Sequence, residues 1–378
     1  MINEIIENLK KSVKDSIIDK EIIIPWINES TEVITLKEIL DFLRIPFVFP
    51  PIVDPEIEIS EKDEELDKEI YEYGIEALAW YISFHRSSKW GIYFRVRGLF
   101  YLSNLFKTKN NLNDINCRIK IAFEVLFYHE FFHFLTDLTA ATMEMIYKKP
   151  IYNNYFDSIN IVIKNAPVKL LHQCCNPNAE GFILIEEPLA NAYVLKRTSK
   201  NWHYKIKRFF DKQPIPYDKY YYFTDDYTFL KGKRKLGLIL TNSCKINHIN
   251  NLNDLIVKFM YTPKIIPFWE FLFNADPEKL FLPQIPIYFV FEGKYSSDVF
   301  RLSIISDGVK IAVYPCDHPP PHLHIWIPID SKREIKCLYP SLEPYKGYRS
   351  LSTKEKKKIM RIIEQNKDKI EKRINKMK

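Results

Sequence analysis

The stretch EVLFYHEFFHFLTDL, residues 124–138, lies inside a run from residue 113 to residue 149 that contains no glycine and no proline. Asn113 or Asp114 is a suitable N-cap for a helix, because a short polar side chain there accepts a hydrogen bond from a free backbone N–H group. Pro150 marks the far end. The run therefore predicts one long helix, and its many apolar residues predict that most of it is buried.

His129, Glu130 and His133 spell the pattern His-Glu-x-x-His on this helix. Residues four apart lie on one helix face with Cβ atoms about 5–6 Å apart, so both imidazoles can bind one metal ion. Glu130, rotated by about 100° from His129, can take a proton from a water whose pKa zinc lowers to about 7. The alternative is a pair of core histidines, but burying these groups without a common partner is costly. We therefore expect a Zn²⁺ site.

A catalytic zinc ion takes three protein ligands and keeps one position open. The metzincin spacing needs a glycine three residues and a ligand six residues after the second histidine, and Thr136 and Thr139 occupy those positions. Asp137 lies one turn beyond His133, about 6 Å along the helix axis, and suits a contact in the second layer or with substrate better than ligation. The third ligand is therefore expected from another segment.

The segment LIEEPLANAYVLK, residues 184–196, supplies a glutamate on a second predicted helix from about residue 186 to residue 197. Glu187 is followed by an alanine at the third position and by Asn191 at the fourth. This offset brings the asparagine back to orient a ligand histidine. Glu187 is the expected third ligand, and Glu186 is the alternative.

The motifs HEFFH and EEPLAN together resemble the gluzincin-type metallopeptidases, in particular the ImmA/IrrE-like cytoplasmic peptidases, over about residues 90–200. The resemblance implies a zincin-like domain that hydrolyses peptide bonds with zinc. It implies these roles: zinc ligation by His129, His133 and Glu187, catalysis by Glu130 as base, and orientation of a ligand histidine by Asn191.

Two further parts of such a site are harder to place. A second donor to the developing oxyanion is usual, and the candidates are His203 and Tyr221, with Tyr220 and Tyr222 as neighbours of the latter. By analogy with this fold, the predicted strand at about residues 91–96 is a candidate for binding substrate by edge pairing.

Composition excludes several classes of protein. The 378 residues include only 9 glycines and contain neither a Walker A run nor a dinucleotide fingerprint, which argues against the common nucleotide enzymes. The sequence has no apolar run long enough for a membrane span and begins with an amphipathic pattern instead of a signal peptide. Its six cysteines lack a metal-type spacing, and we expect reduced thiols in a cytoplasmic protein.

The expected fold class is α+β: a largely helical zincin-like domain with a small sheet, then a small β-rich domain closed by a C-terminal helix. We expect a helix at residues 61–84, irregular structure at residues 150–178, and a strand at residues 236–241. The predicted parts are an N-terminal helical and extended segment (1–60), the metallopeptidase domain (61–230), a connecting region (231–296) and the β-rich domain (297–378).

The C-terminal part carries a second polar constellation in YPCDHPPPHLHIWIP, residues 314–328. Asp317, His318, His322 and His324 crowd into eight residues, and the prolines forbid a helix. One hypothesis is a metal site. The hypothesis that we favour is a structural turn whose polar side chains hydrogen-bond to the backbone. From about Val299 onward the sequence resembles a small bacterial domain of uncharacterised function, whose members often occur near toxin–antitoxin-type genes.

The net charge of +7 resides in residues 354–378, which hold eleven Lys/Arg against four Asp/Glu. Because the rest of the chain is neutral, a solvated helix face is favoured over nucleic-acid binding. The spelling STKE, residues 352–355, predicts a capping box at the start of this helix.

The sequence thus predicts a zinc-dependent metallopeptidase that cleaves a specific cytoplasmic protein target. Its C-terminal module would recognise the target or a regulatory protein, in a toxin–antitoxin or defence-type system, without membrane contact. One alternative is a non-catalytic interaction protein with a structural metal, which a fourth ligand from His172, Cys174 or Cys175 would favour. The other is a C-terminal module that acts on nucleic acid, with affinity that falls steeply with salt.

Overall fold

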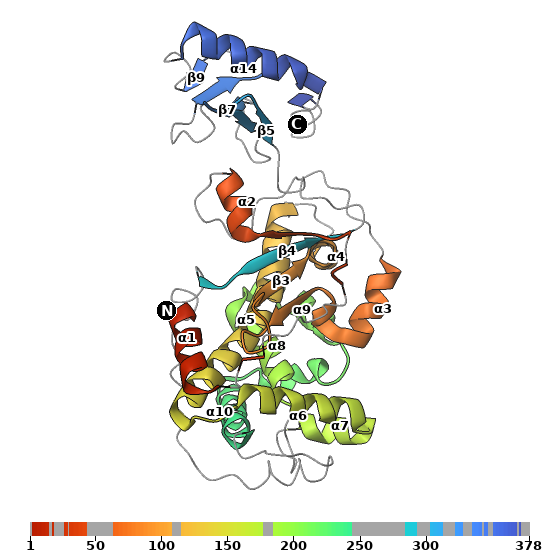
Figure 1. Cartoon of the computed structure of the whole chain (residues 1–378). Helices are drawn as coiled ribbons and strands as arrows, with labels where there is room; N and C mark the ends of the chain where they lie inside the picture. The colour runs from red at the N-terminus through yellow and green to blue at the C-terminus, as the bar shows by residue number, and fades with distance from the viewer. Residues whose placement is uncertain are drawn as a thin grey trace.

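Figure 1 shows the computed structural model of the chain. The structure describes residues 2–14, 17–18, 26–28, 30–43, 63–107, 115–176, 184–243, 284–292, 303–312, 322–327, 335–341, 344–346, 351–368 and 370–371. These residues form two units with separate hydrophobic cores, one drawn from residues 2–291 and one from residues 309–370. Helices dominate beside two small sheets, so the expected α+β class is confirmed.

A four-stranded sheet with the order β1-β4-β3-β2 lies in the larger unit (Figure 1). Its strands are β1 (Glu32–Thr35), β2 (Ala79–Ile82), β3 (Gly91–Arg95) and β4 (Ile287–Phe291). Strand β3 pairs with β4 in parallel and with β2 in antiparallel fashion. Because both edges of β3 are occupied, the expectation that this strand binds substrate by edge pairing is wrong. The edge strand on this side of the described sheet is β2.

The first helices surround this sheet: α1 (Ile2–Ser12), α2 (Leu36–Leu43), α3 (Glu64–Tyr73), the 3₁₀ turn η1 (Gly74–Ala77) and α4 (Val96–Leu105). The helix expected at residues 61–84 is wrong beyond Tyr73. Gly74 has a φ of +67°, and a Cβ atom there would lie 2.9 Å from the ring of Tyr217. A glycine tolerates both conditions, and it ends α3 so that the chain can enter β2.

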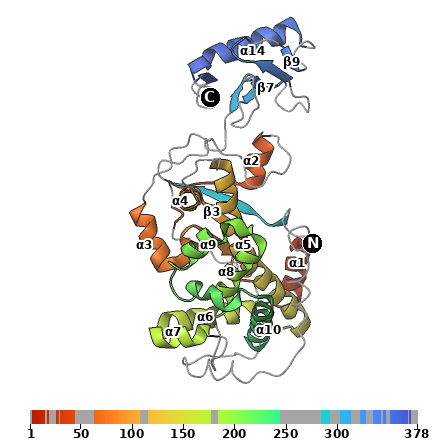
Figure 2. The ribbon, with the colours of Figure 1, turned by 180° about the vertical axis from the view of Figure 1, so that it is seen from behind.

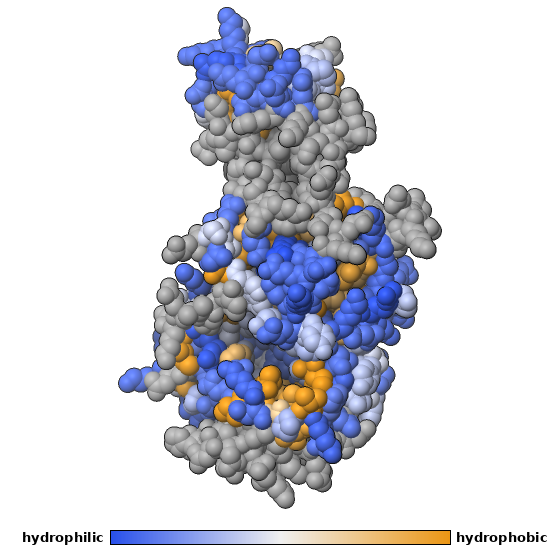
Figure 3. Space-filling model, turned by 90° about the vertical axis from the view of Figure 1, so that its right-hand side faces the viewer, coloured by the Kyte–Doolittle hydropathy of each residue, from blue (hydrophilic) through white to orange (hydrophobic). Residues whose placement is uncertain are grey.

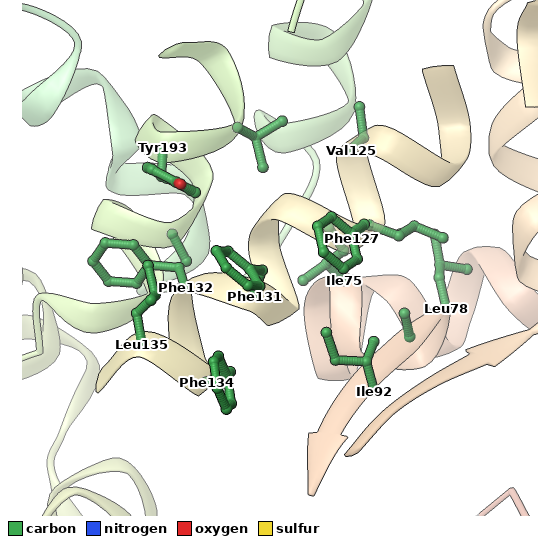
Figure 4. Packing of buried hydrophobic residues seen from close by; sticks show 14 of the residues in the cluster. Ile75, Leu78, Ile92, Val125, Phe127, Phe131, Phe132, Phe134, Leu135 and Tyr193 are labelled. Carbon is green, nitrogen blue, oxygen red and sulfur yellow. The ribbon is translucent and has the colours of Figure 1, made fainter. Parts of the chain in front are cut away.

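Helix α5 (Ile115–Tyr147) is the 33-residue centre of the larger unit. Its apolar residues are spread around the whole circumference, which is typical of a helix buried on all sides. It packs on β2 and β3 and also on α1, α4 and α8. Figure 4 shows Phe127 close to Ile75 on one side and Phe132 on the side of Tyr193. This dense packing fixes the position of the His-Glu-x-x-His motif, which lies near the middle of the helix.

The chain continues as α6 (Tyr152–Asn165), α7 (Val168–Cys175), α8 (Glu186–Arg197), η2 (Lys200–Trp202), α9 (His203–Phe210), η3 (Tyr217–Phe223) and α10 (Asp226–Ser243). The irregular structure expected at residues 150–178 is wrong, because α6 and α7 occupy most of this range. The strand expected at residues 236–241 is also wrong. A short apolar run does not distinguish a buried strand from a buried helix segment, and here it lies in α10.

The smaller unit is an antiparallel sheet of five strands in sequence order, packed against a helix (Figure 2). Its elements are β5 (Ser303–Ser306), β6 (Val309–Ala312), β7 (His322–Trp326), β8 (Ile335–Leu338), β9 (Pro344–Lys346) and α14 (Thr353–Gln365). Ile359, Ile362 and Ile363 of α14 are buried in its core. The predicted capping box is confirmed, because Ser352 and Glu355 each accept from the other's backbone N–H group.

Residues from all predicted parts before residue 297 contribute to the larger unit. The segment 1–60 supplies α1, β1 and α2, and the segment 231–296 supplies most of α10 and all of β4. Figure 3 shows one face of the molecule, largely hydrophilic, with a hollow near the middle of the larger unit and a hydrophobic area below it. Among the described residues, no helix has both the length and the hydrophobicity needed to cross a membrane.

Candidate metal centre

Helix α5 places His129, Glu130 and His133 at the centre of the larger unit. The side chain of His129 is fully buried and that of His133 is 12% exposed. Their Nε2 atoms lie 3.2 Å apart, as expected for side chains one turn apart on the same face. Burial lowers the pKa of His129, which favours the neutral imidazole that a metal ion requires.

Helix α8, which packs against α5, brings Glu187 to the two imidazoles. Its Oε2 atom lies 3.2 Å from His129 Nε2 and 3.3 Å from His133 Nε2. Two atoms bound to one tetrahedral zinc ion at about 2.0–2.1 Å are about 3.3–3.4 Å apart. The three atoms of this ligand trio (His129, His133, Glu187) therefore already have the spacing that a tetrahedral ion needs.

The buried Oε2 atom of Glu187 makes no hydrogen bond, although two ring nitrogens lie near it. An unsatisfied buried carboxylate oxygen is costly, and a cation bound by all three atoms would satisfy it. Although burial opposes this, the His133 and His129 imidazoles lower the pKa of Glu187, so the carboxylate is in the ionised form that binds a metal. Among the described residues, this group of potential ligands has three members.

A second layer of hydrogen bonds fixes the orientation of both rings. In the tautomers that leave both Nε2 atoms available to a metal, His129 Nδ1 donates to Asn191 Oδ1 at 2.9 Å, and His133 Nδ1 donates to Glu186 Oε1 at 2.8 Å. The Tyr155 hydroxyl donates to the other oxygen of Glu186. The geometry thus places Glu187 in the trio and Glu186 behind His133, as a residue that orients the ring.

Asn191 is itself held in place, because its Nδ2 atom donates to the backbone oxygen of Tyr217 at 2.9 Å and to Gln213 Oε1 at 3.1 Å. Its amide cannot flip without losing these bonds. Helix α8 therefore supplies Glu187 to the trio, and it also supplies Asn191 and Glu186, which bond to the Nδ1 atoms of His129 and His133.

Glu130 lies close enough to the trio for its carboxylate to interact electrostatically with His133 and Glu187. Its side chain is buried, its Oε1 atom has no hydrogen-bond partner, and it accepts from the backbone N–H of Tyr81 in β2. Burial raises the pKa of Glu130 well above its usual range, and the Glu76 and Glu187 carboxylates add to this. A divalent cation beside it would lower the pKa again, which would give a base close to the ion.

Glu76 and Tyr217 also lie at this site, and the sequence did not predict either. The Tyr217 hydroxyl donates to Glu76, and the Tyr217 ring stacks near the His129 ring with centroids 6.1 Å apart. Burial and then the charge of Glu187 raise the pKa of Glu76 to about 7. Neither residue stands at a motif spacing from the histidines, so no pattern in the sequence could have identified them.

The contacts recorded for the two candidate oxyanion donors, His203 and Tyr221, are with residues outside the trio. His203 begins α9, and its Nε2 atom contacts the backbone oxygen of Thr198 at 3.1 Å. Tyr221 is 51% exposed and contacts the rings of Tyr220 and Tyr222. Of the tyrosines in η3, Tyr217 is the one whose ring stacks near a member of the trio.

Asp137 belongs to a second buried group one turn beyond His133. It accepts from the Tyr81 hydroxyl at 2.7 Å and from His85 Nδ1. The other ring nitrogen of His85 contacts Glu144 Oε2 at 3.0 Å. We call these three residues the His85 cluster (His85, Asp137, Glu144). Sequence reasoning missed His85, which stands 44 residues before the first motif histidine.

The second polar constellation is only partly visible. Asp317 and His318 lie outside the described residues. His322 and His324 fall on β7. His324 is buried, at 4% exposure.

Comparison with known proteins gives one match. A family profile described as a domain of unknown function (DUF4160) matches residues 308–373. The C-terminal unit therefore corresponds to a domain of unknown function, in agreement with the sequence resemblance. No curated protein and no solved structure matches the chain.

Proposed function

We propose that the larger unit is a zinc-dependent peptidase. The observation that carries the proposal is the ligand trio, in which three potential ligand atoms converge at 3.2–3.3 Å and a buried carboxylate oxygen lacks any other partner. Three protein ligands leave the fourth position for water, whereas a structural zinc site is closed by four. Cys174 and Cys175, which could have closed the site, are free thiols on α7 outside this group.

The residues around the trio fit peptide hydrolysis. When bound, zinc would lower the pKa of a water molecule and polarise the substrate carbonyl. Glu130 would take the proton of the attacking water and return it to the leaving amine, since its carboxylate interacts with His133 and Glu187 and its Oε1 atom has no hydrogen-bond partner. Asn191 and Glu186 hold the two imidazole rings in a fixed orientation through hydrogen bonds to their Nδ1 atoms.

Strand β2 is the element that we propose to bind the substrate backbone. The backbone N–H of Arg95 donates to the oxygen of Leu78, so alternate residues from Leu78 onward face β3. Ala79 and Tyr81 therefore face away from β3, and the Tyr81 N–H reaches Glu130. A peptide added to this edge would run past the catalytic base.

The metal content of the purified protein tests the proposal. We expect about one zinc per chain in the wild type and in Glu130→Gln, and a loss of zinc in Glu187→Ala. Glu186→Ala is the matched neighbour and should still load at saturating zinc, because Glu186 contacts the outer nitrogen of His133 and the Tyr155 hydroxyl and is not a member of the trio. A wild type without zinc, or a Glu187→Ala variant that keeps it, would contradict the assignment.

Activity is tested by comparing cleavage across a cell's proteins between the wild type and Glu130→Gln. Removing a general base costs about 10²–10⁴-fold in rate, so fragments formed by the wild type should be absent from the variant. Identical fragment patterns, with both proteins carrying zinc, would exclude a peptidase that uses Glu130.

For the C-terminal unit we propose recognition of the protein target or of a regulatory protein, in a cytoplasmic defence or toxin–antitoxin setting. Its separate core and the basic α14, which buries isoleucines on one side and carries lysines, support a docking role. The free thiols among the described cysteines are consistent with a reducing compartment. Cross-linking in cells, with and without Lys356→Glu and Lys357→Glu, would show whether this helix contacts a partner.

A further inference from the structure

One carboxylate at the site has no role in binding or activating the metal. Glu187 belongs to the trio, Glu186 orients His133, and Glu130 is the candidate base. Glu76 remains. It lies in η1 between Ile75 and Ala77, both of which are fully buried, while Glu76 itself is only half-buried.

The chain holds Glu76 in a fixed place. On the core side, the oxygen of Ala77 accepts from Arg95 Nη1 at 2.8 Å. On the other side, Gly74 has no Cβ atom, which allows the Tyr217 ring to lie directly against η1. The Tyr217 hydroxyl then donates to Glu76. The same Tyr217 ring stacks near His129, so this carboxylate is fixed beside the trio.

Glu76 is not a member of the group whose potential ligand atoms lie within 4.8 Å of one another. Within the described part of the chain, no lysine or arginine pairs with it, and the nearby cationic group is His133. A metal-bound imidazole is neutral, so this partner disappears in the loaded site. Glu76 then has no cationic partner among the described residues, and a cationic group of the substrate would supply one.

Part of the site is exposed to solvent. His129 and Glu130 are closed to solvent, whereas the side chains of Glu186 and Glu187 are 15% and 18% exposed. Glu76 is also only half-buried, so both Glu76 and part of the trio are accessible from solvent.

We propose that Glu76, held by Tyr217, binds a positively charged group of the substrate next to the scissile bond. This inference rests on the proposed function. The chemistry that it recognises is an ammonium or guanidinium group, supplied by the amino terminus of a peptide or by a lysine or arginine side chain. The enzyme would accordingly prefer cationic substrates, and Glu76 would be the residue that sets this preference.

Small hydroxamates test the inference without knowledge of the natural substrate, because the hydroxamate group binds zinc directly. The first pair is acetohydroxamate and glycine hydroxamate, which differ by an α-ammonium group. The second pair is hexanohydroxamate and 6-aminohexanohydroxamate, which differ by a terminal ammonium. Calorimetry measures binding to zinc-loaded wild type, Glu76→Gln and Glu72→Gln, where Glu72 is an exposed residue of the same segment.

We expect at least one cationic probe to bind the wild type about tenfold more tightly than its neutral counterpart, as for one charge-assisted contact. The advantage should vanish in Glu76→Gln and persist in Glu72→Gln, while the neutral probes bind all three proteins equally. Which pair shows the advantage distinguishes an amino terminus from a basic side chain. Tyr217→Phe should retain zinc and reduce the advantage.

The ways in which this can fail are distinct. If the neutral hydroxamates do not bind the wild type, the metal centre is wrong and the inference falls with it. If neutral probes bind but neither cationic probe gains affinity through Glu76, the inference is wrong and the metal centre stands. A Glu76→Gln variant that loses zinc would show that Glu76 is a ligand, which also overturns the inference.

Discussion

Helix α5 contributes side chains to two buried groups of histidine and carboxylate residues, and these groups differ in how their atoms are directed. In the ligand trio, three atoms converge on one point and Glu187 Oε2 has no hydrogen bond. In the His85 cluster, the two carboxylates lie on opposite nitrogens of one ring. The same residue types thus form a candidate metal centre in one case and a site for a proton in the other. Residue type and burial do not distinguish the two, and the directions of the ring nitrogens do.

The oxygens of the His85 cluster have further partners. Asp137 accepts from the Tyr81 hydroxyl, and Glu144 accepts from the backbone N–H groups of Ile151 and Tyr152 at 2.5 and 2.8 Å. These two groups are at the start of α6, where free N–H groups and the helix dipole favour a negative charge. Because no atom of this cluster is left unsatisfied, a metal ion would gain nothing there.

His85 must carry a proton on both nitrogens, since each faces a carboxylate. Burial lowers its pKa, but Asp137 and Glu144 outweigh this and raise it to about 9. The ring is stacked between Phe84 and Tyr152, with centroids 4.8 and 5.0 Å away. Through Tyr81, the cluster also fixes β2, whose backbone reaches Glu130. The proton site therefore supports the geometry of the candidate metal centre.

The largest effect should come from removing the imidazolium. His85→Leu leaves Asp137 and Glu144 buried without their common cation, and breaking a buried charge pair in this way costs about 3–5 kcal/mol. Urea unfolding measures the loss of stability. His203→Leu is a suitable control, because His203 is only half-buried and its recorded bond is to one backbone oxygen; its cost should stay near or below about 1.5 kcal/mol. Equal effects of the two substitutions would refute the charge pairing.

A pH series should show the same cluster in the unmodified protein. The pKa of His85 is raised from 6.5 to about 9 on folding, so its stabilisation is fully present below pH 6.5 and is lost as the pH rises through 9. The shift corresponds to about 3 kcal/mol. The groups that face His85 are Asp137 and Glu144, with Tyr81 and Tyr152 beside them. We expect the free energy of unfolding to fall over this range more steeply in the wild type than in His85→Gln, and parallel curves would contradict the assignment.

The comparison also shows what the sequence could reveal. His129, Glu130 and His133 follow from spacing on one helix, and Glu187 and Asn191 from spacing on another, because helical periodicity converts sequence offsets into positions on a face. Glu76 and Tyr217 reach the candidate metal centre, and His85 reaches its own cluster, from segments at least 44 residues away from the first motif histidine. Their positions depend on tertiary packing, such as the contact of Gly74 with the Tyr217 ring, which leaves no periodic signal.

The local errors have a similar origin. The helix expected through residue 84 ends at Gly74 because of a left-handed backbone conformation and a close contact, both set by the fold. The apolar run in α10 is short enough to suit either a strand or a buried helix. By contrast, the α+β class, α5, α8 and the capping box at Ser352 depend on long or chemically specific patterns, and these expectations were confirmed.

Added zinc should separate the two groups by stability. A ligand that binds the folded state at about 100 times its Kd stabilises by about 2.7 kcal/mol. We expect this increment in the wild type and its absence in Glu187→Ala, as measured by thermal unfolding with zinc and with chelator. Asp137→Asn should lower the baseline stability and keep the increment, since Asp137 serves the proton site. An increment lost in Asp137→Asn but kept in Glu187→Ala would reverse the assignment of the two groups.

The smallest effect that we expect to be measurable concerns Asn191, which supports the trio without joining it. Asn191→Ala removes the acceptor of the His129 Nδ1 proton, so the ring loses the contact that fixes its tautomer and orientation. Losing such a partner lowers metal affinity by about 10–100-fold, measurable by competition with a zinc-binding dye. Asn165→Ala is the control, because Asn165 is an exposed residue that bonds to its own helix. If zinc affinity did not change in Asn191→Ala, packing alone would orient the His129 ring. His129 would then be held by stacking on Tyr217, as His85 is stacked on Phe84 and Tyr152.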